Sequence, residues 1–156
     1  YAAGGTYQIS GLKYREMKKD DPGNIRLLEK GVEILPRVVT PENLNKGVVE
    51  VIVEDDIVPL PLSDALLGTL VEIRGISVDE VYVTTKEESS SFGAMTMTCT
   101  KDGESIQIRT LPLYEDGELL TERDFLGFVI DVTGILDTYE GKSQIRVFSI
   151  DDITVY

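Results

Sequence analysis

The 156 residues carry 15 basic and 28 acidic side chains, a net charge of −13, and 42% of them are hydrophobic. This composition is typical of a globular chain with a core and excludes a disordered one. No apolar run approaches the ~20 residues that cross a bilayer. The chain has no histidine, no tryptophan and one cysteine, which excludes the commonest general base, Ser-His and Cys-His catalysis and an internal disulfide framework. We therefore expect a protein that is not an enzyme and that needs no metal or cofactor.

The first 62 residues contain two expected strands, residues 7–14 and 24–39, joined by a charged stretch. A helix is expected to begin at Thr40, because a threonine cap precedes a proline at the first helical position. Val39 and Leu44 have the spacing of a hydrophobic staple across that start. Residues 48–53 form a further expected strand, and the prolines of 59–62 mark a join to the rest of the chain.

From residue 69 onward the pattern favours strands. Residues 70–76, which continue toward 83, alternate apolar and polar side chains, as a half-buried strand does. Residues 95–100 and 105–110 flank an Asp102-Gly103 turn, a strong hairpin signal because a type I′ turn needs positive φ.

A short helix is expected next, followed by two more strands. Thr121 is the expected cap with Asp124 three residues on, Leu120 and Phe125 have the spacing of a hydrophobic staple, and Gly127 ends the helix. The expected strands then lie at 128–136 and 143–149, and residues 153–156 finish the chain.

The order of three strands, a helix and two strands predicts a mainly β fold, the five-stranded Greek-key barrel of the OB-fold. Residues 66–76 and 125–135 repeat one pattern of glycine, strand and glycine, which fits a sharply curved barrel. A β-sandwich fragment and a ferredoxin-like fold are the alternatives, and one helix is too few for the latter. We assign residues 63–156 to the OB-fold domain and residues 1–62 to a β-rich segment, a degenerate or truncated OB-like unit.

OB-folds bind ligands across strands 2 and 3 and the neighbouring loops. Mapped onto this chain, that face predicts a ligand-binding set that could stack on a ligand or contact its phosphates or carboxylates: Phe92, Gln107, Arg109, Tyr114, Tyr139, Lys142 and Arg146. The competing interpretation is that Gln107, Arg109 and Arg146 are only the solvent face of amphipathic strands. Nucleic acid is disfavoured as the ligand, because residues 68–156 carry 7 basic against 17 acidic side chains.

Three acidic clusters, at residues 54–56, 115–118 and 151–152, lack the spacing of an EF-hand and are expected to be solvated turns. Cys99 alternates with threonines and is expected to be a buried structural thiol.

The chain resembles OB-fold domains of surface and periplasmic lipoproteins from gut-dwelling Gram-negative bacteria. The resemblance covers residues 24–156 and rests on three patterns: Gly31–Thr40 followed by a Glu-x-Leu helix, Leu70–Ile76, and Gly134–Ile135 through Tyr139-x-Gly-Lys-x-Gln-Ile145 to Ile153. It implies an exported chain that is lipid-anchored upstream of residue 1. The expected partner is an oligosaccharide, a peptide or a protein, and these patterns do not identify which. Such domains are often labelled nucleic-acid-binding by fold analogy alone.

Overall fold

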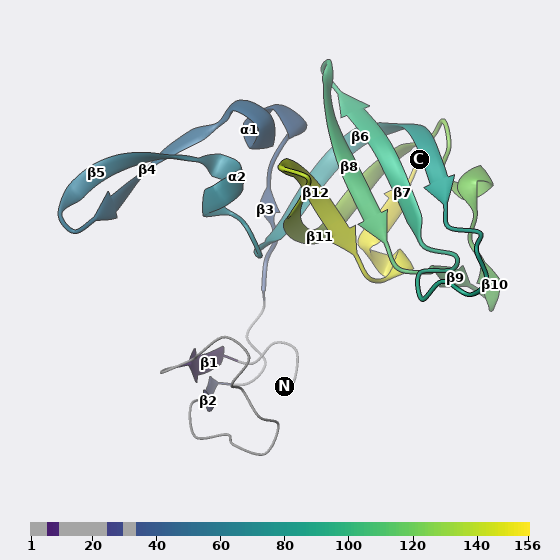
Figure 1. Cartoon of the computed structure of the whole chain (residues 1–156), viewed down its shortest axis with the longest axis horizontal. Helices are drawn as coiled ribbons and strands as arrows, with labels where there is room; N and C mark the ends of the chain where they lie inside the picture. The colour runs from purple at the N-terminus through teal and green to yellow at the C-terminus, as the bar shows by residue number, and fades with distance from the viewer. Residues whose placement is uncertain (1–5, 10–24, 30–33) are drawn as a thin grey trace. The chain divides into compact units, whose positions relative to one another are not determined.

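A computed structural model describes residues 6–9, 25–29 and 34–156, and its elements are labelled in Figure 1. The chain divides into two compact units, Tyr1–Leu35 and Pro36–Tyr156. In the first, strands β1 (Thr6–Ile9) and β2 (Ile25–Glu29) pair antiparallel. The predicted strands at 7–14 and 24–39 extend beyond β1 and β2. Residues 10–14, 24 and 30–33 of these predictions lie outside the described residues.

The second unit holds all remaining elements. Its strands are β3 (Arg37–Val38), β4 (Val48–Val53), β5 (Asp56–Pro61), β6 (Leu70–Val83), β7 (Met95–Lys101), β8 (Glu104–Thr110), β9 (Tyr114–Glu115), β10 (Glu118–Leu119), β11 (Val129–Tyr139), β12 (Lys142–Val147) and β13 (Ile153–Val155). Its helices are α1 (Pro41–Lys46), α2 (Leu62–Ala65) and the 3₁₀ turns η2 (Glu122–Asp124) and η3 (Ile150–Asp152). None of the helices in the described ranges is long and apolar enough to span a bilayer.

Five strands close a barrel in the order β6-β7-β8-β12-β11, and β11 pairs back onto β6. All these pairs are antiparallel except β8 with β12, which run parallel. This order, with η2 between the third and fourth barrel strands, is that of the OB-fold, so the predicted fold class is confirmed. β3 and β13 add to the sheet beside β6 and β11.

The turn and cap signals produce the predicted local structure. Asp102 and Gly103 both have positive φ, 53° and 83°, and connect β7 to β8. Thr40 and Asn43 form a capping box at α1, with reciprocal hydrogen bonds that satisfy backbone donors a helix start leaves unpaired. At η2 the Thr121 amide donates to the Asp124 carboxylate at 2.6 Å.

The barrel interior holds the side chains that alternation placed there. Seven fully buried side chains of the barrel strands belong to this interior: Val71, Ile73, Met97, Ile108, Val132, Ile145 and Val147. Phe125, just after η2, is 1% exposed and belongs to the same core. Gly134 permits close packing of β11 on β12, since a Cβ there would lie 2.5 Å from the carbonyl oxygen of Arg146.

The division between units falls after Leu35, whereas the sequence predicted a boundary between residues 62 and 63. The reason is that the segment after Pro36 packs on the barrel. The Val39 amide donates to the carbonyl of Glu72, and Leu44 of α1 is 2% exposed within the barrel's core cluster. The predicted strand at 48–53 is β4, but its partner β5, which contains Pro59 and Pro61, was not predicted.

Candidate ligand-binding face

Strand register aligns polar side chains into two rows across the outer face of the barrel. One row runs from Thr96 on β7 through Arg109 on β8 to Arg146 on β12. The next row contains Thr98, Gln107, Gln144 and, on β11, Asp137. Since side chains alternate across a strand, the residues between these positions point into the core.

Arg109 and Arg146 are directly opposite each other in the parallel β8–β12 pair. A guanidinium nitrogen of Arg109 donates to the Thr96 hydroxyl at 2.7 Å, and Arg109 forms no salt bridge with any residue the structure describes. Arg146 lies 3.7 Å from a carboxylate oxygen of Asp137 and 5.7 Å from the centre of the Phe148 ring. Of these two cations on neighbouring strands, only Arg146 pairs with a carboxylate among the described residues.

A groove of about 490 Å³ lies along this face. Its lining residues come from β7, β8, β11 and β12: Thr96, Gln107, Arg109, Asp137, Thr138, Tyr139, Gln144 and Arg146. Tyr139 is 59% exposed, so its ring is available to a ligand. The Gln144 amide donates to Asp137 at 3.4 Å, which places that carboxylate between Gln144 and Arg146.

A second hollow of about 520 Å³ continues from Gln107 toward α1. Asn45 of α1, Ser63 of α2 and Lys142 of β12 line it, together with hydroxyl groups of β7 and β8. Asn45 is fixed in place, because its amide donates to a Glu104 carboxylate oxygen at 3.0 Å and to the Ser105 carbonyl at 3.1 Å. This wall was not predicted, because no local pattern connects α1 with a strand 60 residues later.

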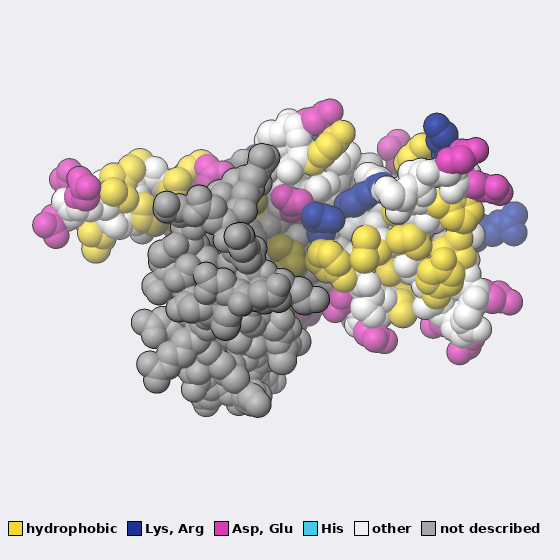
Figure 2. Space-filling model, turned by 60° about the horizontal axis from the view of Figure 1, so that its bottom comes forward, with side chains coloured by type: hydrophobic (Ala, Val, Ile, Leu, Met, Phe, Trp, Pro, Cys, Tyr) yellow, Lys and Arg dark blue, Asp and Glu magenta, His cyan; other side chains and the backbone are white. Residues whose placement is uncertain are grey.

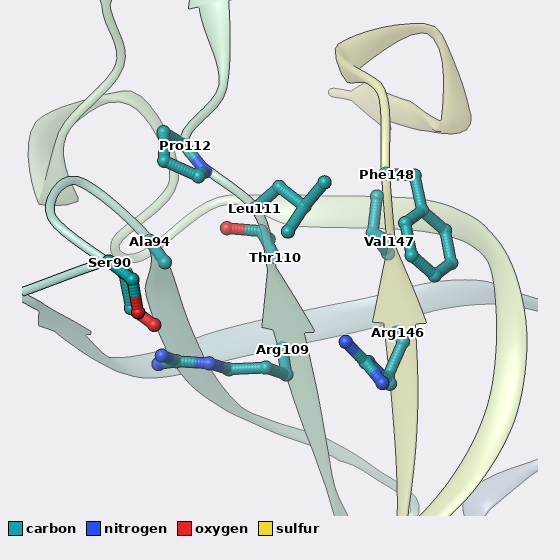
Figure 3. Close-up of a pocket in the computed structure, with 10 residues that line it drawn as sticks. Ser90, Ala94, Arg109, Thr110, Leu111, Pro112, Arg146, Val147 and Phe148 are labelled. Atoms are coloured by element: carbon teal, nitrogen blue, oxygen red, sulfur yellow. The ribbon is translucent and has the colours of Figure 1, made fainter.

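A smaller cavity of about 90 Å³ lies on the other side of the arginine row, at the C-terminal ends of β8 and β12. Figure 3 shows Arg109 extending toward Ser90 of the β6–β7 loop and Arg146 on the neighbouring strand, with Phe148 two residues further along the chain. Three hollows therefore follow one another along β8 and β12.

The structure brings together five of the seven predicted site residues. Gln107, Arg109, Tyr139 and Arg146 line the groove, and Lys142 lines the adjoining hollow. Phe92 and Tyr114 are 40% and 56% exposed but line none of these three hollows. Asn45, Ser63, Asp137 and Phe148 were not predicted.

The described residues contain no cluster of three or more histidine, cysteine, aspartate or glutamate side chains that could hold a metal ion. Burial raises the pKa of the Cys99 thiol to about 12. Cys99 therefore stays protonated near neutral pH and is a poor nucleophile.

No protein-family model matches the chain, and no curated protein matches it. Among solved structures, a replication protein A heterotrimer bound to single-stranded DNA is similar at 15% identity, covering 72% of this chain and 75% of that chain, with a TM-score of 0.40. The OB-fold assignment rests on the strand order and register of the chain itself.

Proposed function

We propose that the barrel is a non-enzymatic binding module whose ligand lies along β8 and β12 and presents an anionic group to Arg109 and Arg146. The observation that carries this proposal is the pair of arginines opposite each other in the β8–β12 register. Like charges directly opposite on adjacent strands are destabilising, and guanidinium groups bind carboxylate and phosphate in bidentate fashion. Asp137 pairs with Arg146 and not with Arg109, so it compensates only one of the two charges. A bound anion between the arginines would offset the remaining repulsion.

The proposed ligand is extended and polar, such as an acidic oligosaccharide or an acidic peptide. The hollow toward α1 supports this, because its Asn45, Ser63 and Gln107 side chains offer amide and hydroxyl groups. Tyr139 is the one aromatic side chain that lines the described groove, which suits contact with a single ring or residue.

Titration calorimetry with four probes tests the proposal: oligogalacturonate, a neutral gluco-oligosaccharide, an oligoglutamate peptide and a thymidine oligonucleotide. We expect binding to an acidic oligosaccharide or peptide, and at least roughly tenfold weaker binding for the double variant Arg109→Ala and Arg146→Ala. Arg109→Ala alone should also weaken binding, and Arg123→Ala is its matched control, because it removes one positive charge from η2, outside the groove. Equal losses in both proteins would show that net charge, and not the face, determines affinity.

Single-stranded nucleic acid is the second candidate. The exposed rings of Tyr139 and Phe148 beside the arginines favour it, since bases stack on aromatic side chains next to cations. The net negative charge of the barrel disfavours a nucleic-acid ligand. If nucleic acid is the ligand, its affinity must fall as salt rises, because neutralised phosphates release counterions. No binding of the oligonucleotide at ~50 mM salt would end this alternative.

Absence of catalysis and export as a lipoprotein belong to the same proposal. The first is supported by the lack of histidine in the chain, and the second by the family resemblance alone. Turnover of any probe that disappears in an Asp137→Asn variant would contradict the first. For the second, the protein should partition with membranes of its native bacterium and be released by detergent; recovery in the soluble cytosolic fraction would contradict it.

A further inference from the structure

The β4–β5 hairpin extends from the barrel and has two different outer edges (Figure 1). The Leu62 amide donates to the Gly47 carbonyl at 2.8 Å, at the base of the ladder that pairs Val48 with Pro61. Hydrogen-bonded and non-bonded pairs alternate along an antiparallel ladder. Residues 49, 51 and 53 therefore bond to β5, whereas 48, 50 and 52 direct their amides and carbonyls away from it.

The same alternation places residues 57, 59 and 61 on the outer edge of β5. Two of these are Pro59 and Pro61, which have no amide hydrogen, so this edge cannot pair with another strand. On β4 the outward positions are Val48, Glu50 and Ile52, and all three keep their donors. One edge is blocked and the other is open.

The hairpin also exposes large apolar side chains to solvent. Ile52 is 78% exposed and Ile57 67%, and of the two strands only Val49 packs against the barrel core. Figure 2 shows hydrophobic side chains along this projection and acidic ones at its free end. A two-stranded ribbon is marginally stable by itself, so a further strand on the open edge would extend the sheet and cover apolar surface.

We propose that this strand is β4 of a second copy, paired antiparallel about a two-fold axis with Val51 opposite its counterpart. Pairing centred on Glu50 would place two carboxylates opposite each other, which is destabilising. Centring on Val51 places Glu50 opposite Ile52 of the second copy and aligns the valines of both strands on one face.

Charge also favours this register. The hairpin tip carries Glu54, Asp55 and Asp56, and each tip comes beside residues 46–48 of the other copy. Lys46 lies there, with its side chain 61% exposed even though it pairs with Glu104. Each acidic tip thus meets a cation, and one isologous contact closes as a dimer.

Sedimentation equilibrium of the full chain between ~10 μM and ~1 mM tests the proposal, because interfaces this small associate weakly. We expect a monomer–dimer equilibrium that Glu50→Pro weakens on the order of tenfold or more and that Glu50→Ala retains. Glu50→Pro removes one outward amide and leaves the β4–β5 ladder intact. Its partner across the ladder is Pro59, which already lacks an amide hydrogen without breaking the pairing. A monomer throughout this range, or equal dimerisation of both variants, would overturn the proposal.

Cysteine cross-linking tests the register without relying on affinity. Under mild oxidation Val51→Cys should form a disulfide-linked dimer on the order of tenfold faster than Val53→Cys, since only residue 51 faces its own counterpart. Cys99 is buried and stays silent in both variants. Equal rates for the two variants, or faster linkage through residue 53, would overturn the register.

Discussion

Replacing Phe125 by alanine tests whether this side chain closes the barrel beneath η2. Phe125 is 1% exposed and is the largest of the fully buried side chains. Truncating such a residue loses its transfer free energy and leaves a cavity, for a cost of about 3–5 kcal/mol. That is a large part of the 5–15 kcal/mol by which a domain is typically stable. We expect a large fall in the urea midpoint.

Phe128→Ala is the matched control, because it deletes the same atoms three residues later, at a side chain that is 42% exposed. Full burial of a phenylalanine contributes about 1.5–3 kcal/mol, so the partly exposed ring should cost about 1 kcal/mol when removed. Arg109→Ala, on the outer face, should cost about 0.5 kcal/mol or less. Equal small losses for Phe125 and Phe128 would refute the assignment of Phe125 to the core.

Three further predictions follow from single contacts. Gly134→Ala should destabilise by about 1–3 kcal/mol in urea denaturation, because its Cβ would meet the Arg146 carbonyl, and a loss below that range would mean the strands can separate there. Cys99 should resist thiol reagents in the native state and react in urea; rapid native labelling would contradict its burial. The hydrogen bond from Lys46 lowers the pKa of Glu104, so its stabilisation is present above the ordinary glutamate pKa and is lost as pH falls through the lowered one. Glu104→Gln should therefore flatten the fall in stability below the ordinary glutamate pKa, and an unchanged profile would contradict this.

The barrel was predictable because its determinants are local. Asp102-Gly103 specifies a turn with two positive φ angles, and Thr121 with Asp124 specifies a helix start. Period-two alternation then assigns each strand residue to the core or to the outer face. Such signals act within a few residues of each other, so a sequence reveals them without knowledge of which strands become neighbours.

The composition of the candidate site was only partly predictable, because it depends on contacts between distant segments. Alternation placed Gln107 and Arg109 on the outer face, but their partners Gln144 and Arg146 follow from the parallel register of β8 with β12. Asn45 reaches the site only because α1 packs on β8. The OB-fold analogy selected Tyr114 by its sequence position, and the structure places it outside the groove.

The β4–β5 hairpin shows why prolines misled the interpretation of residues 59–62. Proline is rare in central strands, so Pro59 and Pro61 indicated a join and not a strand. In a two-stranded ribbon, however, every second residue directs its amide outward, and proline at those positions costs no ladder hydrogen bond. The prolines block one edge and leave the pairing with β4 complete. A protein that blocks one edge of a ribbon and keeps the other open has a sheet that can grow in one direction only, which limits assembly through this hairpin to a closed pair and excludes an extended fibre.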